Sequence, residues 1–114
     1  MLQDAKAAVR ARFDAFNAAD WTRFKELISP EAAIYFPGVP TALTRDGWVA
    51  VCLSMEPKPP VIQISIDEQI AEGDSVATRW TIRGGAAAMH GVSIDRVADG
   101  LVVEHREFFE QAAR

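Results

Sequence analysis

The sequence predicts an α+β fold, in which a curved, mainly antiparallel sheet wraps around N-terminal helices and encloses a pocket. Apolar residues in the first half recur at helical spacing, whereas those in the second half alternate with polar residues between glycine-containing turns. Helices that precede a long antiparallel run cover one side of the sheet. The space left between helices and sheet then becomes a pocket.

Composition bounds the class of protein before any motif is considered. The 114 residues suit one domain, residues 1–114, and the formal net charge of −4 comes from interspersed acids and bases. No basic stripe suggests nucleic acid, and no apolar run of about 18 residues suggests a membrane span. The single cysteine, Cys52, excludes an internal disulfide. Together with the lack of a leader pattern, this predicts a cytoplasmic protein.

Three helices are predicted, over residues 4–18, 20–28 and 46–55. Asp4 and Asp20 suit the N-cap positions of the first two, because an aspartate side chain accepts hydrogen bonds from the first free backbone N–H groups. The apolar stripe of the first helix consists of Val9, Phe13 and Phe16.

Strands are predicted over residues 32–36, 61–71 and 75–83. A three-residue loop at 72–74 would place Ile66 opposite Trp80, Ile70 opposite Val76, and Asp67 opposite Arg79. This register gathers the isoleucines on one face, so it is favoured over a two-residue loop that would mix the faces.

Residues 89–110 predict a hairpin around the two-residue turn Asp99–Gly100, which favours type I′ geometry. Counting outward from this turn pairs Ile94 with His105 and Val92 with Glu107. The face predicted to look inward consists of His90, Val92, Ile94, Arg96, Val103, His105, Glu107 and Phe109.

This inward face collects the candidate catalytic residues Glu107, His105 and His90. Burial disfavours a carboxylate anion, which would prepare Glu107 for proton transfer with a nearby imidazole as partner. The alternatives are that Glu107 is paired with Arg96 or solvated at the strand end, and that His105 is a hydrogen-bonded core histidine. Two imidazoles and a carboxylate are also zinc ligands, but no local spacing signature accompanies them, so no metal site is predicted.

Three aromatic residues are candidates for binding a substrate. Tyr35 offers a phenol on an otherwise apolar segment, and Trp48 and Trp80 would form aromatic pocket walls. The alternatives are a tyrosine anchored at the rim and tryptophans that only fill the core.

Several strings resemble the nuclear transport factor 2-like superfamily. Residues 16–20 (FNAAD) are similar to its first helix pair and residues 73–76 (GDSV) to its central hairpin, while residues 99–105 (DGLVVEH) resemble the closing strand of SnoaL-like polyketide cyclases. The resemblance covers nearly the whole chain. It implies a conical α+β fold with a deep pocket, and a homodimer through the outer face of the sheet.

The resemblance also bears on individual positions. In the SnoaL-like cyclases the closing strand continues to a Trp and an acid/base Asp, which correspond to Arg106 and Glu107 here. Residues 105–110 are similar to the closing string of limonene-epoxide hydrolases, but the Arg and Asp of their central hairpin correspond to Trp80 and Ile82. The base position of ketosteroid isomerases falls on Phe36. Glu107 is therefore the carboxylate that the resemblance implies as general acid/base.

The sequence thus predicts a small enzyme that performs cyclase, isomerase or hydratase chemistry on a largely apolar carbonyl compound. Such chemistry requires no cofactor, and none is predicted. The alternative is a non-catalytic ligand-binding or dimerisation module, and a third possibility is a cone filled by side chains. Val102 and Phe108, apolar among charges on the predicted outer face, suggest the homodimer.

Overall fold

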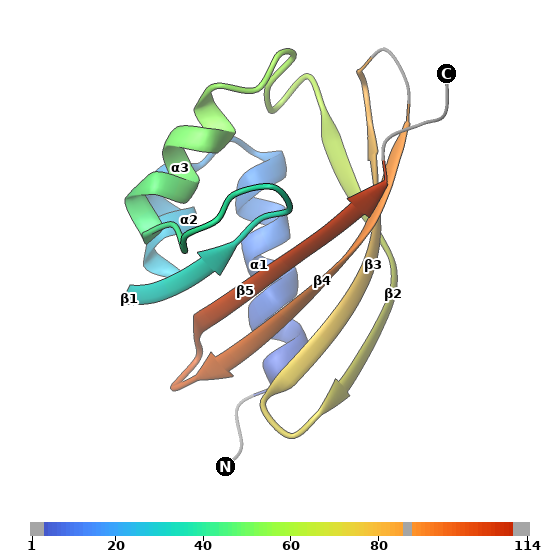
Figure 1. Ribbon diagram of the computed structural model, residues 1–114. Coiled ribbons are helices and arrows are strands. Elements are labelled where there is room, and N and C mark those ends of the chain that lie inside the picture. Colours follow the sequence, from blue (N-terminus) through green and yellow to red (C-terminus); the bar gives the residue numbers. More distant parts are fainter. Residues whose placement is uncertain (1–3, 86–87, 111–114) are drawn as a thin grey trace.

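The computed structural model describes residues 4–85 and 88–110, in which helices cover one face of a curved five-stranded sheet (Figure 1). The helices are α1 (Ala5–Asn17), α2 (Trp21–Glu26) and α3 (Arg45–Leu53). The strands are β1 (Ile28–Tyr35), β2 (Gln63–Glu72), β3 (Ser75–Arg83), β4 (Met89–Ala98) and β5 (Leu101–Glu110). Their order is β1-β5-β4-β3-β2, antiparallel except for β1 and β5. The predicted α+β class is confirmed.

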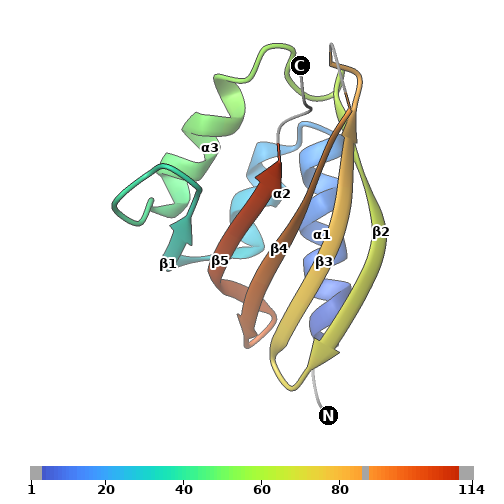
Figure 2. The same ribbon diagram turned by 45° about the vertical axis from the view of Figure 1, so that its right-hand side comes forward.

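Helix α1 lies along the concave face of the sheet (Figures 1 and 2). Asp4 caps it as predicted, because its Oδ1 accepts from the backbone N–H of Lys6 at 3.0 Å. At the other end the Asn17 amide accepts from Ile64 N at 2.7 Å and donates to Ile64 O at 2.9 Å. The helix is thereby fastened to β2, which keeps its apolar stripe turned toward the sheet.

The boundary between α2 and β1 differs from the prediction. Helix α2 ends at Glu26 rather than Ile28, and β1 begins at Ile28 rather than Ala32. The reason is tertiary, since the Leu27 carbonyl accepts from the backbone N–H of Val102 at 3.0 Å. Pairing with β5 therefore recruits residues that local propensity assigns to the helix.

The β2–β3 register is as predicted at one end and wrong at the other. Ile66 opposes Trp80, but a register shift between Ile66 and Glu68 makes Glu68 the partner of Arg79. Asp67 is the extra residue of a β-bulge, which sends the following side chains to the other face. Glu72 opposes Ser75, so the loop has two residues and the predicted three-residue loop is wrong. Ile70, predicted to face the core opposite Val76, therefore opposes Ala77 and is 63% exposed.

A similar shift corrects the β4–β5 hairpin. Asp99 and Gly100 have the positive φ values, 54° and 79°, of the predicted type I′ turn. Val97 opposes Val102 as predicted, but the register then shifts, so that Asp95 opposes His105. The face of β4 that meets the helices is therefore Gly91, Ser93, Asp95 and Val97.

The prediction that the other residues of β4 face inward is therefore wrong. The residues concerned are all exposed: His90, Val92, Ile94 and Arg96. Val102, which was placed on the outer face, is fully buried. Strand β5 keeps its predicted orientation beyond the bulge, with His105 buried and Glu107 half-buried. Within the described ranges, no helix is long and apolar enough to cross a membrane.

Candidate active site

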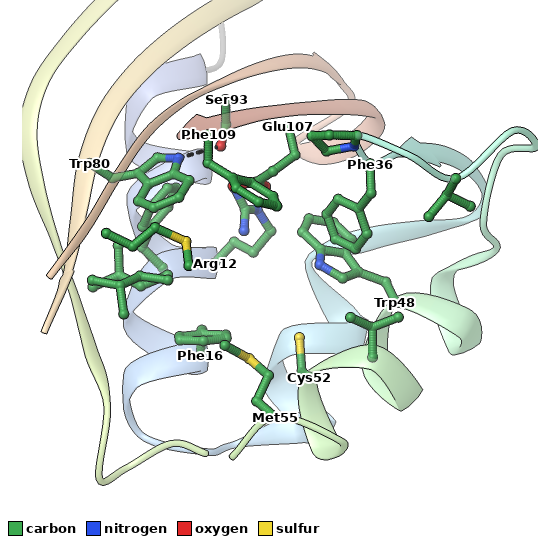
Figure 3. Close-up of a pocket in the computed structure, with 17 residues that line it drawn as sticks. Arg12, Phe16, Phe36, Trp48, Cys52, Met55, Trp80, Ser93, Glu107 and Phe109 are labelled. Atoms are coloured by element: carbon green, nitrogen blue, oxygen red, sulfur yellow. Dashed lines mark hydrogen bonds between the residues drawn. The ribbon is translucent and has the colours of Figure 1, made fainter. Parts of the chain in front are cut away.

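A cavity of about 350 Å³ lies between the helices and the concave face of the sheet (Figure 3). Its volume falls within the usual range for small-molecule sites. The polar side chains that line it are Arg12, Ser93 and Glu107, and most of the remaining wall is aromatic, aliphatic or sulfur-containing. Burial raises the pKa of the Cys52 thiol to about 12, so this wall residue stays uncharged. A cone filled by side chains would not leave such a space.

Glu107 ends a chain of hydrogen bonds that runs through the protein interior. Its Oε1 lies 2.5 Å from Nε2 of His105, whose Nδ1 lies 2.6 Å from Oδ1 of Asp95. Nη2 of Arg12 donates to Oδ2 of Asp95 at 3.4 Å. The two ends of the chain, Arg12 and Glu107, both line the cavity.

The middle of this chain is a buried ion pair. Burial by itself would raise the pKa of Asp95, but the charges of His105 and Arg12 and their hydrogen bonds hold it below its usual value. Burial would lower the pKa of His105, but the charge of Asp95 and hydrogen bonds to Asp95 and Glu107 hold it above its usual value. The raised pKa favours the imidazolium form of His105, in which one ring nitrogen donates to Asp95 and the other to Glu107.

Aromatic rings cover the two cations of the chain. The Trp48 ring stacks on His105 with a centroid distance of 4.2 Å. The guanidinium carbon of Arg12 lies 4.8 Å from the Trp48 ring centroid and 4.6 Å from that of Phe13. The electron-rich faces of these rings favour positive charge where water is scarce. Trp48 lines the cavity as predicted, and it also supports the charged chain.

Trp80 lines the opposite part of the cavity, as the sequence also predicted. Its indole N–H donates to Oγ of Ser93 at 2.8 Å, which orients the ring (Figure 3). The indole lies across the backbone of β4 at Gly91, where an added Cβ would overlap the ring and would come within 2.5 Å of the Phe108 carbonyl oxygen. Gly91 is thus the position that lets Trp80 lie flat against the sheet.

Two predicted site residues lie outside the cavity. His90 is exposed on β4, and its Nδ1 lies 3.1 Å from the Thr81 hydroxyl. The bulge shifts β5 by one residue against β4, so His90 lies on the face opposite to that of Glu107. The predicted cluster of Glu107 with His90 is therefore wrong. Tyr35 packs against the Arg106 guanidinium, 4.1 Å from the ring centroid, on the side away from the buried Ile34. Strict alternation along β1 gives the inward position to Ile34, not Tyr35.

Sequence reasoning missed two members of the chain, Arg12 and Asp95. Arg12 follows Val9 by three residues and precedes Phe13, so it occupies the apolar stripe of α1, a position at which an arginine is unusual. Asp95 was placed on the outer face because the bulge was not foreseen. The position of Arg12 in the apolar stripe could have been recognised from the sequence. The inward position of Asp95 could not, because it depends on the register between β4 and β5.

The arrangement does not resemble a metal centre. Among residues 4–85 and 88–110, no three His, Cys, Asp or Glu side chains are placed to hold a metal ion. Both ring nitrogens of His105 already meet carboxylates, which leaves no free imidazole lone pair for a cation. The site is instead suited to proton transfer between Glu107 and a molecule in the cavity.

These elements and this cavity define a nuclear transport factor 2-like fold, and comparison with known proteins narrows the class. The family model described as a SnoaL-like domain matches residues 9–105. The chain therefore belongs to the SnoaL-like domain family. No curated protein matches the chain by sequence.

Solved structures share the fold along nearly the whole chain. Wild-type IdmH from Streptomyces antibioticus, a candidate polyketide cyclase, has a TM-score of 0.88 at 26% identity, over 95% of this chain and 93% of its own. A candidate ketosteroid isomerase from Kribbella flavida has a TM-score of 0.83 at 24% identity, over 96% of this chain and 80% of its own. AclR from Streptomyces galilaeus, a candidate hydroxylase, has a TM-score of 0.78 at 24% identity, over 93% and 88%.

Proposed function

We propose that this protein is a cofactor-independent enzyme that moves a proton on a compact, largely apolar carbonyl compound. Glu107 is the general acid/base, and the reaction is a cyclisation, an isomerisation or a hydration. The observation that carries the proposal is the placement of the Glu107 carboxylate on an otherwise mostly apolar cavity wall, with Oε1 2.5 Å from Nε2 of His105. A carboxylate held in this way is both accessible to a ligand and fixed in direction.

His105 and Asp95 act through Glu107 rather than on the ligand. His105 does not line the cavity, and its raised pKa keeps it a donor to Glu107. This donation occupies Oε1, so the other oxygen of Glu107 is left to exchange a proton with the ligand. His105 is therefore a positioning residue, and Asp95 fixes the orientation of its ring.

The related structures agree with this class of chemistry. Among them are a candidate polyketide cyclase and a candidate ketosteroid isomerase. The family and the shared fold do not choose between these reactions, because one fold carries many activities. The proposal therefore depends on Glu107 itself.

A paired ligand screen tests the proposal. Wild type, Glu107→Gln and the control Glu104→Gln are screened by thermal shift against small ketones, lactones, epoxides, steroids and polyketide fragments. Glu104 lies on the same strand and pairs with Arg96 and Arg106 at the surface. We expect shared ligands, one of which is consumed by wild type and Glu104→Gln but not by Glu107→Gln. Unchanged turnover by Glu107→Gln would refute the assigned role.

A non-catalytic ligand-binding module is the second candidate function. The observation that favours it is the cavity lining, in which few polar side chains stand among many apolar ones. In this case the same compounds would stabilise all three proteins, and none would be consumed by any of them.

The proposal includes a cytoplasmic location and a homodimer through the outer face of the sheet. Cys52 is a free thiol, as in proteins of reducing compartments. Phe108 on β5 opposes Val92 on β4, with exposed fractions of 52% and 36%, and Ile94 nearby is 43% exposed. In the proposed dimer contact, Val92 and Ile94 join Phe108 in place of Val102, which is buried. A second copy would cover this apolar group by two-fold symmetry, and sedimentation of only monomer at high concentration would exclude it.

A further inference from the structure

Arg12 is a buried cation whose hydrogen-bonding capacity is largely unused. Its side chain is 5% exposed, and its one hydrogen bond to a described residue is the 3.4 Å contact with Asp95. The Nε atom has no partner among the residues that the structure describes. A guanidinium carries five N–H donors, and burying them without acceptors is costly. Arg12 therefore has N–H donors that lack a hydrogen-bond acceptor among the described residues.

Arg12 reaches the cavity, although its Nε atom is itself buried. Arg12 contributes to its wall from α1, while Glu107 contributes from β5, and both are seen in the same close-up (Figure 3). The guanidinium face packs against the rings of Phe13 and Trp48. The N–H groups of a guanidinium lie in its plane, so this packing covers the faces of the group and leaves its edge to meet a molecule in the cavity.

The charge of the site indicates which acceptor is suitable. When His105 is protonated and both carboxyl groups are ionised, the charges of Arg12 and His105 balance those of Asp95 and Glu107, so the chain is neutral as a whole. A ligand that is permanently anionic would add an unbalanced negative charge beside mostly apolar walls. A neutral carbonyl oxygen would accept from Arg12 without this cost.

We infer that Arg12 binds the carbonyl oxygen of a neutral, enolisable ligand and holds the negative charge that develops there. This inference rests on the proposed function of Glu107. The C–H bond next to the carbonyl breaks, the proton passes to Glu107, and its electron pair forms a C=C bond. The π electrons of the carbonyl move to oxygen, giving an enolate against Arg12. The negative charge thus moves from Glu107 to the ligand, and the site stays neutral throughout.

A stable analogue of the enolate tests this assignment. 4-Nitrophenol changes its absorbance on ionisation, so a titration reports whether it is bound as phenolate. The host is the Glu107→Gln protein, because a neutral glutamine imitates Glu107 after it has taken the proton. We expect this protein to bind the phenolate, and absence of phenolate binding would overturn the inference.

Second substitutions in the same protein assign the binding to Arg12. Arg12→Met should weaken phenolate binding on the order of 100-fold, and Arg12→Lys about 10-fold because it keeps the charge but loses the planar fork. Arg10→Met is the matched control, since Arg10 is exposed on the same helix. If Arg12→Met does not fold, Arg12→Lys alone decides. Affinity equal to that of Arg10→Met in the Arg12 variants that fold would contradict the inference.

Two further measurements separate this inference from the proposed function. Wild type should bind cyclohexanone in the cavity more tightly than cyclohexanecarboxylate. The reverse order of affinities would overturn the choice of a neutral ligand. Deuterium exchange into a bound ketone tests Glu107 alone. Exchange that survives Glu107→Gln, with phenolate binding still dependent on Arg12, would refute the base while leaving the oxygen-binding role of Arg12 in place.

Discussion

Strands β4 and β5 carry one charge network on each face, and the two networks differ mainly in their access to water. On the outer face, Glu104 accepts from Arg96 at 3.3 Å and from Arg106 at 2.7 Å, with side chains 26–49% exposed. On the inner face, Asp95 and His105 are 2.6 Å apart and 0–1% exposed. Similar ion pairs on adjacent residues therefore have different energetic consequences.

Outer-face pairs are screened by solvent and contribute about 0–1 kcal/mol each. Inner-face charges lose their hydration on folding, and their attraction does little more than offset that loss. Removing one inner partner, however, leaves an uncompensated buried charge. The inner network is thus poorly explained by stability alone, whereas a role in holding Glu107 at the cavity explains its placement.

The largest effect is expected from Asp95→Asn. This change leaves the cations of His105 and Arg12 buried without their shared carboxylate. We expect the free energy of unfolding to fall by about 3–5 kcal/mol, measured by urea denaturation. A loss below about 1 kcal/mol would show that the inner network behaves like the outer one.

Gly91→Ala should have the next largest effect. The added methyl group would overlap the Trp80 ring and approach the Phe108 carbonyl. Overpacking of this kind costs about 1–3 kcal/mol and should also change tryptophan fluorescence. Gly47→Ala in α3 is the control, because its nearest neighbour would be Oγ1 of Thr44 at 3.3 Å and alanine favours helix. Equal stability of the two variants would argue against the tight packing of Trp80 on β4.

The pH dependence of stability should report His105. Its pKa is raised in the folded protein, so its contribution is fully present below its unfolded pKa of about 6.5 and is lost as pH rises through the folded value. The slope from this one proton is at most about 1.4 kcal/mol per pH unit. His105→Gln should remove this alkaline decline in urea denaturation, and His90→Gln at the exposed position should keep it. A decline that depended on His90 instead would contradict the assignment.

Asp95 should affect the pH dependence of stability at acidic pH. Its lowered pKa contributes stability that is present above its unfolded value of about 3.9 and is lost as pH falls through the folded value.

The smallest change is expected on the outer face. Glu104→Gln should alter the free energy of unfolding by less than about 1 kcal/mol, because the remaining charges are solvated. The same urea denaturation measures it. A loss as large as that of Asp95→Asn would remove the distinction between the two faces.

The same two strands show how far sequence reasoning reaches. The turn at Asp99–Gly100 and the inward alternation of His105 and Glu107 were predictable, because turn chemistry and period-two patterning are local. The bulge next to the turn was not predictable from these local signals. Val102 and Val103 are both apolar, so the alternation of apolar and polar residues does not show which residue is extra. A register shift of one residue makes Asp95, rather than Ile94, the partner of His105.

All three helices were predicted, because caps and apolar spacing are also local signals, but the end of α2 was not. Arg12 was the exception, since an arginine in an apolar stripe can reach water or stay buried, and only its partner decides. That partner, Asp95, is 83 residues away in sequence. The part of the site that depends on long-range pairing was therefore beyond sequence reasoning.

Exchange of a carbon-bound proton reports directly whether Glu107 transfers protons. A ketone that stabilises the protein would be incubated in deuterated buffer and followed by proton NMR. Wild type and Glu104→Gln should introduce deuterium next to the carbonyl, while Glu107→Gln should bind the ketone without exchange. Equal exchange by wild type and Glu107→Gln would contradict a proton-transfer role for Glu107.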